Sequence, residues 1–196
     1  MTRQRLTREQ SKEQTRQHLL YAAHTIFIEK GFAAASVEKI TVVAGYTRGA
    51  FYSNFDSKSE LFLEVLKLDH EAMRRDLSDF LDGDFNCGEM QARIALFCSQ
   101  LHNDKNHLPL WTEAKRLAIS DTQFRGNLNA FLMEKLEKLT AYIHECSTPA
   151  SPPWSSPPET LAHGIMYTVY GVGGGNATRL TEFERLDGTL TQGAKK

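Results

Sequence analysis

Apolar residues recur at helical spacing along most of the chain. In residues 12–29 they fall three or four positions apart, which places them on one face of a helix. Ser11 followed by Gln14 has the form of a capping box, which satisfies exposed amide groups at a helix start. Gly31 follows the apolar run, where a helix end favours a residue that tolerates a left-handed conformation. We therefore expect a first helix over about residues 12–29.

Two short helices and a longer one are predicted next. A helix over residues 36–44 begins at a serine and precedes Gly45, and a helix over residues 47–54 begins at a threonine. Ser57 and Glu60 repeat the capping-box spacing and open a long amphipathic helix. We expect six apolar side chains to hold the short helices together at a steep angle, namely Phe27, Val37, Ile40, Ala44, Phe51 and Phe55.

The rest of the chain continues the helical pattern. Polar and glycine residues predict a break at 81–88, and the apolar spacing predicts helices at about 89–102, 108–119, 122–144 and from Glu159. Five prolines within residues 147–158 exclude regular helix or strand there. Since no segment alternates convincingly between apolar and polar residues, the sequence predicts an all-α fold.

The two short helices and the glycine between them have the form of a helix-turn-helix. In this motif the second helix enters the DNA major groove, and residues near its N-terminus reach the base edges. Arg48 can pair with a guanine edge, and the small Gly49 and Ala50 let the backbone come close. We expect Arg48, Gly49, Ser53 and Asn54 to face outward.

Charge is distributed unevenly along the chain. Residues 1–55 carry eight Lys or Arg and four Glu, although the whole chain has a net charge of −1. A basic head on an acidic remainder suits binding of an anion such as DNA. No stretch approaches the roughly 18 consecutive apolar residues of a membrane span, and residues 1–17 do not resemble a secretory signal. We expect a cytoplasmic protein without membrane contact.

Cysteine, histidine and glycine patterns give little support to catalysis or metal binding. The three cysteines form no CxxC pair. Cys98 and His102 share a helical face, with His107 nearby, but a buried thiol beside a surface histidine is the simpler interpretation. The segment Gly171–Gly175 follows a helical stretch and lacks the lysine of a phosphate-binding loop. We expect no catalytic residues, no metal and no cofactor.

A more specific indication is the run from His18 to Leu66, which closely resembles the DNA-binding head of the tetracycline-repressor-like (TetR) family. The matching positions are Ala22, Ala23, Phe27, Gly31, Phe32, Val37, Ile40, Ala44, Gly45, Phe51, Tyr52, Phe55 and Lys58. Thr41 departs from the alanine that is usual in the family, which is a small change.

The resemblance implies a role for each matching residue of the head. Hydroxyls and free amides at helix N-termini favour phosphates, which agrees with phosphate contacts by Ser36 and Thr47. The resemblance adds backbone-phosphate contacts by Tyr52, Asn54 and Lys58, and base reading by Arg48, Gly49 and Ala50. The alternatives are a core aromatic at Tyr52 and an ordinary surface lysine at Lys58.

The resemblance also implies two domains, a helix-turn-helix domain over residues 1–60 and a helical ligand-binding and dimerisation domain over residues 61–196. The first ten or so residues would be a flexible basic arm. Aromatic and thioether side chains could line the pocket of a small-molecule effector or simply form core, namely Phe97, Trp111, Phe124, Phe131, Met166, Tyr167 and Tyr170.

The expected partners are a palindromic double-stranded DNA operator, an effector that changes DNA affinity, and a second copy of the chain. The family dimerises through its last two long helices, and this chain has Gly171–Gly175 where the last of them should begin. The rival interpretation is a small helical ligand-binding protein or enzyme that does not bind DNA.

Overall fold

The computed structural model describes residues 7–80, 87–145 and 157–170, and within these ranges every regular element is a helix. The helices are α1 (Arg8–Ala34), α2 (Val37–Ala44), α3 (Arg48–Tyr52), α4 (Lys58–Phe80), α5 (Cys87–Asn103), α6 (His107–Ser120), α7 (Thr122–Glu145) and α8 (Pro158–Tyr170). The predicted all-α fold is confirmed. None of these described helices is both long and apolar enough to cross a membrane.

The first helix begins earlier than predicted. Thr7 is the capping residue: its hydroxyl accepts a hydrogen bond from the Gln10 amide at 3.2 Å, and the Gln10 side chain accepts one from the Thr7 amide at 2.9 Å. The capping box expected at Ser11 and Gln14 was therefore placed four residues too late, and the chain is helical from Arg8 rather than a flexible arm up to residue 10.

Gly31 interrupts the end of α1, as its sequence position indicated. Its φ of 74° is a conformation that glycine adopts without strain and other residues rarely adopt. The helical stretch resumes briefly and ends at Ala34, five residues beyond the predicted end. The Phe32 amide donates to the Glu113 carboxylate of α6 at 3.2 Å, which fixes the chain immediately after this break.

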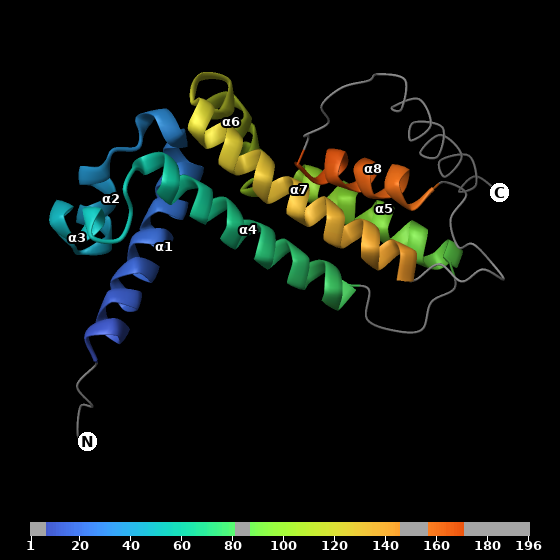
Figure 1. The fold of residues 1–196 in the computed structure, drawn as a ribbon, viewed down its shortest axis with the longest axis horizontal. Coiled ribbons are helices and arrows are strands. Elements are labelled where there is room, and N and C mark those ends of the chain that lie inside the picture. The colour runs from blue at the N-terminus through green and yellow to red at the C-terminus, as the bar shows by residue number, and fades with distance from the viewer. Residues whose placement is uncertain (1–6, 81–86, 146–156, 171–196) are drawn as a thin grey trace. The chain divides into compact units, whose positions relative to one another are not determined.

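The predicted turn between the two short helices is confirmed. Ser36 caps α2 by accepting a hydrogen bond from the Lys39 amide at 3.2 Å. Gly45 ends α2 in the left-handed conformation, and its amide and that of Tyr46 donate to carbonyls in the last turn of α2. Helices α1, α2 and α3 pack together into one cluster (Figure 1).

Helix α3 is shorter than predicted, and the start of α4 differs in one bond. Thr47 caps α3 as expected, but α3 ends at Tyr52 rather than at residue 54. At α4 the Ser57 hydroxyl accepts from the Glu60 amide at 3.0 Å, whereas the Glu60 carboxylate accepts from the amide of Asp56 rather than that of Ser57. Only half of the predicted second capping box is therefore present.

The later helices agree with the sequence to within two residues at every predicted boundary. Pro109 lies in the first turn of α6, and Asp121 caps α7 by accepting from the Phe124 amide at 2.9 Å. Pro158 was expected in the proline-rich loop but is the first residue of α8, a position that tolerates proline. Residues 147–156 of that loop and the segment Gly171–Gly175 lie outside the described residues.

The chain divides into two compact units. The first comprises residues 1–80 and 103–128, and the second comprises residues 81–102 and 129–196. This grouping assigns α4 and α6 to the same unit as the helix-turn-helix, whereas the sequence suggested a boundary between residues 60 and 61. Buried side chains of the second unit come from α5, α7 and α8, and are Phe97, Cys98, Phe131, Leu132, Ile143, Ala162, Ile165, Val169 and Tyr170.

An aromatic cluster forms the centre of the first unit. Phe62 of α4 meets Phe27 edge-on at 4.8 Å between ring centroids and stacks on Phe124 at 5.8 Å with an interplanar angle of 12°. Phe32 closes the cluster at 5.0 Å from Phe62. Because these rings come from α1, α4 and α7, they pack these three helices against one another.

Candidate nucleic-acid interface

The second helix of the helix-turn-helix is held by its buried face. Phe51 of α3 is fully buried, and so are Ile40 of α2 and Phe55 after α3. Of the six apolar residues predicted to fix the two helices, Phe27 is also buried, whereas Val37 and Ala44 are only half-buried. The opposite face of α3 is therefore open to a partner.

Four of the proposed DNA contacts lie on that open face. Thr47, Arg48, Gly49 and Tyr52 are exposed, and Ala50 is half-buried beside them. Tyr52 is 51 % exposed and meets Phe51 with the edge of its ring, so it is not the core aromatic of the alternative interpretation.

Arg48 has two neighbours on this surface. Its Nη1 lies 2.9 Å from Oε1 of Glu38 in the first turn of α2, and its Cζ lies 6.0 Å from the centre of the Tyr52 ring. The Tyr52 hydroxyl, followed by the Glu38 carboxylate, raises the pKa of Arg48. Glu38 was not expected on this surface, because a carboxylate matches none of the contacts that DNA phosphates favour.

Ser36 and Thr47 lie at the starts of α2 and α3, as predicted. Each hydroxyl oxygen accepts a hydrogen bond from a backbone amide of its own helix, at 3.2 Å in both cases. A hydroxyl that accepts in this way still has its own proton to donate. Thr47 can therefore cap a helix and donate to a phosphate oxygen at the same time, whereas the Ser36 hydroxyl also bonds the Glu38 carboxylate and would exchange that partner for a phosphate.

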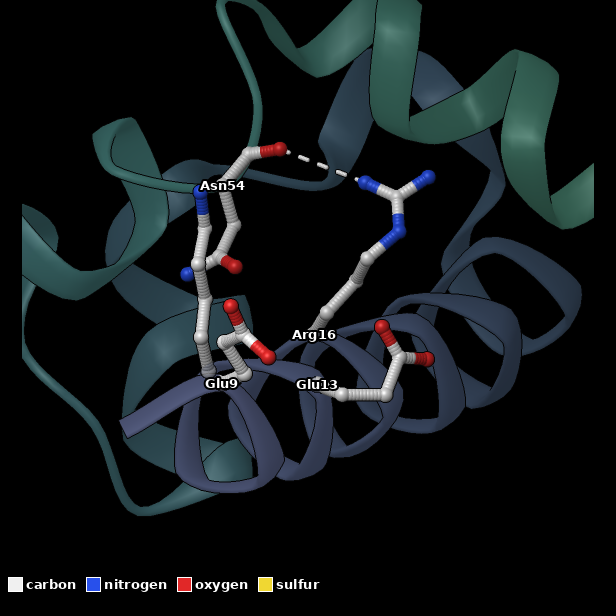
Figure 2. Close-up of a pocket in the computed structure, with 5 residues that line it drawn as sticks. Glu9, Glu13, Arg16 and Asn54 are labelled. Atoms are coloured by element: carbon white, nitrogen blue, oxygen red, sulfur yellow. Dashed lines mark hydrogen bonds between the residues drawn. The ribbon is translucent and has the colours of Figure 1, made fainter. Parts of the chain in front are cut away.

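Asn54 does not face outward, and that expectation is wrong. Its amide nitrogen donates to the Ala50 carbonyl at 2.8 Å, and its Oδ1 is buried without a protein hydrogen-bond partner. Its backbone carbonyl accepts from Arg16 at 3.2 Å, and Figure 2 shows this bond beside Glu9 and Glu13. The side chain therefore bonds its own helix end rather than standing free on the surface.

Lys58 also has partners inside the protein. Its ammonium group donates to the carbonyls of Phe32 at 2.8 Å and Ala35 at 2.7 Å, and lies 4.1 Å from the centre of the Phe32 ring. Partial burial lowers the pKa of Lys58. These bonds satisfy carbonyl groups at the C-terminal end of α1, where a positive charge is favourable. The surface-lysine alternative therefore does not describe its environment.

The Arg16 side chain of α1 bonds both the residues that follow α3 and helix α4. Besides the Asn54 carbonyl it pairs with Glu64 of α4, and its guanidinium lies 4.5 Å above the Phe55 ring. It also lines an open hollow of about 340 Å³, whose other lining residues are Glu9, Lys12, Glu13 and Asn54 (Figure 2). The two carboxylates in this hollow balance its two basic groups, which makes it a poor anion site.

The seven proposed effector-binding residues do not form one group in the described structure. Trp111 and Phe124 are buried in the first unit, and the other five belong to the second. Of those five, three are buried, Met166 is half-buried and Tyr167 is 40 % exposed. A second hollow lies against α1 and α6 and includes none of the seven; its lining residues are Phe27, Ile28, Gly31, Leu108, Pro109, Thr112 and Glu113.

A buried polar cluster joins α4 to α6. The Asp69 carboxylate accepts hydrogen bonds from Nε1 of Trp111 at 2.7 Å and from the ring of His107 at 2.8 Å. Trp111 therefore packs with its polar atom bonded, which argues for a structural role in this unit. The residue pattern could not indicate this cluster, because Asp69 lies 38 residues before His107 and 42 residues before Trp111.

Two short helices joined by a turn at Gly45, with a buried anchor at Phe51 and an exposed Arg48, form a helix-turn-helix, a motif that binds DNA in many proteins. Residues 19–65 match the family model described as bacterial regulatory proteins, tetR family. The helix-turn-helix of this chain is therefore similar to the DNA-binding domain of TetR-family transcriptional regulators.

Individual relatives agree with this assignment. The HTH-type transcriptional regulator AcrR of Shigella flexneri is 42 % identical over 59 residues, which cover 30 % of this chain and 27 % of AcrR. The match thus spans under a third of that relative. Salmonella enterica GusR superimposes with a TM-score of 0.66 at 19 % identity, over 92 % of this chain and 95 % of GusR. The SmeT–triclosan complex gives a TM-score of 0.57 at 21 % identity, over 80 % and 79 % of the two chains. These structures share the fold.

Proposed function

We propose that this protein is a DNA-binding transcriptional regulator, and specifically a ligand-responsive repressor that binds a near-palindromic operator as a homodimer in the cytoplasm. The observation that carries the proposal is the exposed Arg48 at the N-terminal end of α3, on a helix whose other face is anchored by Phe51. A recognition helix enters the major groove with this end, where arginine can donate two hydrogen bonds to a guanine.

In this proposal the residues around Arg48 place the helix on the DNA backbone. Ser36, Thr47 and Tyr52 donate hydroxyl protons to phosphates, while Gly49 and Ala50 allow close approach. Asn54 and Lys58 act in the same interface only if they exchange their present carbonyl partners for a phosphate oxygen. Their first role is to hold the ends of α3 and α1.

The homodimer explains why the operator would be a palindrome. Two copies related by a two-fold axis present two identical recognition helices, which read two half-sites about 34–36 Å apart or a multiple of that distance. A ligand lowers DNA affinity when it favours a different spacing of the two helices, with a typical coupling of about 1–3 kcal/mol.

Support for an effector comes from the aromatic and thioether side chains of the second unit and from a protein of the same fold that was solved with triclosan. The proposed effector is a small apolar or amphipathic molecule. Its proposed contacts in the second unit are Phe97, Phe131, Met166, Tyr167 and Tyr170; Trp111 and Phe124 belong to the other unit.

The test is binding to the DNA upstream of the protein's own gene and to a scrambled duplex, across a salt series. Arg48→Ala is expected to weaken operator binding by about 1–3 kcal/mol while leaving the scrambled duplex nearly unchanged. Arg75→Ala, which removes an exposed arginine of α4, is the charge-matched control.

Equal losses on both duplexes for Arg48→Ala would contradict its role in base reading. No binding of either duplex at low salt would contradict the proposed function, once effector candidates have been included. Release of the operator by an added apolar ligand would support ligand-responsive repression, whereas tighter binding would assign the ligand as a co-repressor.

A further inference from the structure

An acidic residue sits within the proposed DNA-reading surface. Glu38 belongs to the first turn of α2, and its carboxylate reaches Arg48 at the start of α3, with 2.9 Å between the two charged groups. Both side chains are well exposed, at 56 % for Glu38 and 61 % for Arg48. The contact therefore joins the two helices of the motif across its outer face.

The fold itself has little need of this ion pair. Exposed pairs contribute little to stability because water and salt screen them. A carboxylate beside the proposed phosphate contacts of Ser36 and Thr47 also opposes DNA binding through its charge. Neither the stability of the fold nor attraction to DNA accounts for Glu38. Its contact with Arg48 is therefore the feature through which it can act in the DNA-bound state.

Arginine has enough donors to serve two partners. The guanidinium carries five N–H groups in a planar fork, and the contact with Glu38 is made through Nη1. The remaining donors can still bond the two acceptors on a guanine edge. The Tyr52 ring limits the side chain on another side, with its centre 6.0 Å from Cζ. Arg48 is thus oriented before DNA arrives.

We propose that Glu38 is a specificity-determining residue that acts through Arg48. Its carboxylate orients the guanidinium toward a base edge and weakens the alternative contact between Arg48 and a phosphate. The first effect strengthens binding to the operator, and the second weakens binding to all other sequences. This inference rests on the proposed function, because it requires that Arg48 reads a base.

The charge states suit a permanent ion pair. The Glu38 backbone amide, and after it the Arg48 charge, lowers the pKa of the Glu38 carboxyl despite some opposing desolvation. Tyr52, and after it Glu38, raises the pKa of Arg48. Both groups therefore remain charged around neutral pH, so the orientation does not depend on a change of protonation.

The experiment measures the ratio of the dissociation constants for a scrambled duplex and for the duplex that the wild-type protein selects from a random pool. A general charge effect changes both constants equally and cancels in this ratio. Glu38→Gln is expected to lower the ratio about two- to fivefold, the range of an exposed ion pair. Glu29→Gln, on the exposed surface of α1, is the charge-matched control and should leave the ratio unchanged.

Two further variants distinguish the effect of the Glu38–Arg48 contact from the effect of the negative charge of Glu38. Glu38→Asp keeps the charge but shortens the reach, so it should lower the ratio as Glu38→Gln does. In an Arg48→Ala background, Glu38→Gln should leave the remaining ratio unchanged, because the residue through which it acts is gone.

The outcomes for the inference and for the proposed function are distinct. The inference is overturned if Glu38→Gln leaves the wild-type ratio unchanged, or if it lowers the ratio equally with and without Arg48. The proposed function fails, and the inference with it, if the wild-type protein selects no duplex or if Arg48→Ala leaves the selected duplex bound as tightly as before.

Discussion

Two basic side chains of the first unit are used in different ways. Arg48 stands exposed on α3, where its remaining donors can reach a partner. Lys58 is turned toward the carbonyls that end α1 and shields the Phe32 ring. The same kind of charge thus serves recognition at one position and helix termination at the other, according to how much of the side chain the neighbouring helix covers.

A substitution at Gly49 tests whether the DNA approaches the backbone of α3 closely. An added Cβ would meet only the Thr47 hydroxyl, at 3.7 Å, so Gly49→Ala should stabilise the free protein by about 0.5–1 kcal/mol. The same methyl group would enter the space where the DNA approaches and should weaken operator binding by about 1–3 kcal/mol. Melting curves and DNA titrations measure the two effects.

Gly126→Ala is the matched control, because Gly126 also lies in a helix and has nothing within 4 Å of an added Cβ. It should stabilise the protein similarly without changing DNA affinity. Unchanged operator binding by Gly49→Ala would show that the α3 backbone does not approach the DNA closely.

Cys98 of α5 provides a second prediction for a single residue. Burial raises the pKa of this thiol to about 11, so almost no thiolate is present at pH 8. Iodoacetamide at pH 8 should therefore label Cys98 slowly in the folded protein and rapidly in guanidinium chloride, as read by peptide mapping. Equal labelling in both states would contradict the burial of this side chain.

At the scale of helices, local patterns predicted most boundaries but not the contacts between elements. Thr7 and Ser11 each precede a glutamine by three residues, and only the structure shows that Thr7 begins α1. The hydrogen bonds of Arg16 and Lys58 join residues that are distant in sequence. Because such bonds form only when the fold brings the helices together, no spacing in the sequence could indicate them.

The same limit applies to the candidate site. The exposed Arg48, Gly49 and Tyr52 could be predicted, since the motif fixes which face of a short helix is buried. The inward turn of Asn54 could not, because it depends on where α3 ends. The partnership of Glu38 with Arg48 depends on the angle between two helices, which a pattern of residue types does not specify.

The contact between α4 and α6 gives a prediction at this scale. Asp69→Ala removes the acceptor of two hydrogen bonds, from His107 and Trp111, and should lower the free energy of unfolding by about 3 kcal/mol. Asp69→Asn keeps an oxygen there and should cost less. Urea denaturation followed by Trp fluorescence measures both.

Asp76→Ala, at an exposed position of the same helix, controls for the loss of a carboxylate from α4 and for the higher helix propensity of alanine. If it destabilises the protein as much as Asp69→Ala does, the hydrogen bonds to α6 are not the cause.

At the scale of the whole molecule, the division into two compact units affects how stability responds to DNA. The proposed DNA contacts all belong to the first unit. A ligand that binds only the folded state stabilises it, by about 2.7 kcal/mol at a hundredfold excess over the dissociation constant. DNA should therefore stabilise the first unit, which carries the helix-turn-helix, against unfolding.

We expect operator DNA at that concentration to raise the melting temperature by roughly 5–10 °C. Scrambled DNA at the same concentration should raise it much less, and Arg48→Ala should remove the difference. Differential scanning calorimetry also shows whether both units melt together, since only a single cooperative transition gives one well-defined melting temperature. An equal increase with both duplexes would mean that binding is independent of sequence.

Helix α3 spans only Arg48–Tyr52 and is anchored by the buried Phe51. The exposed residues around that anchor contribute little to the hydrophobic core. They can therefore change during evolution, or in the laboratory, with little effect on folding. A descendant of this protein could acquire a new target sequence through a few substitutions on one turn of helix, while the rest of the molecule stays as it is.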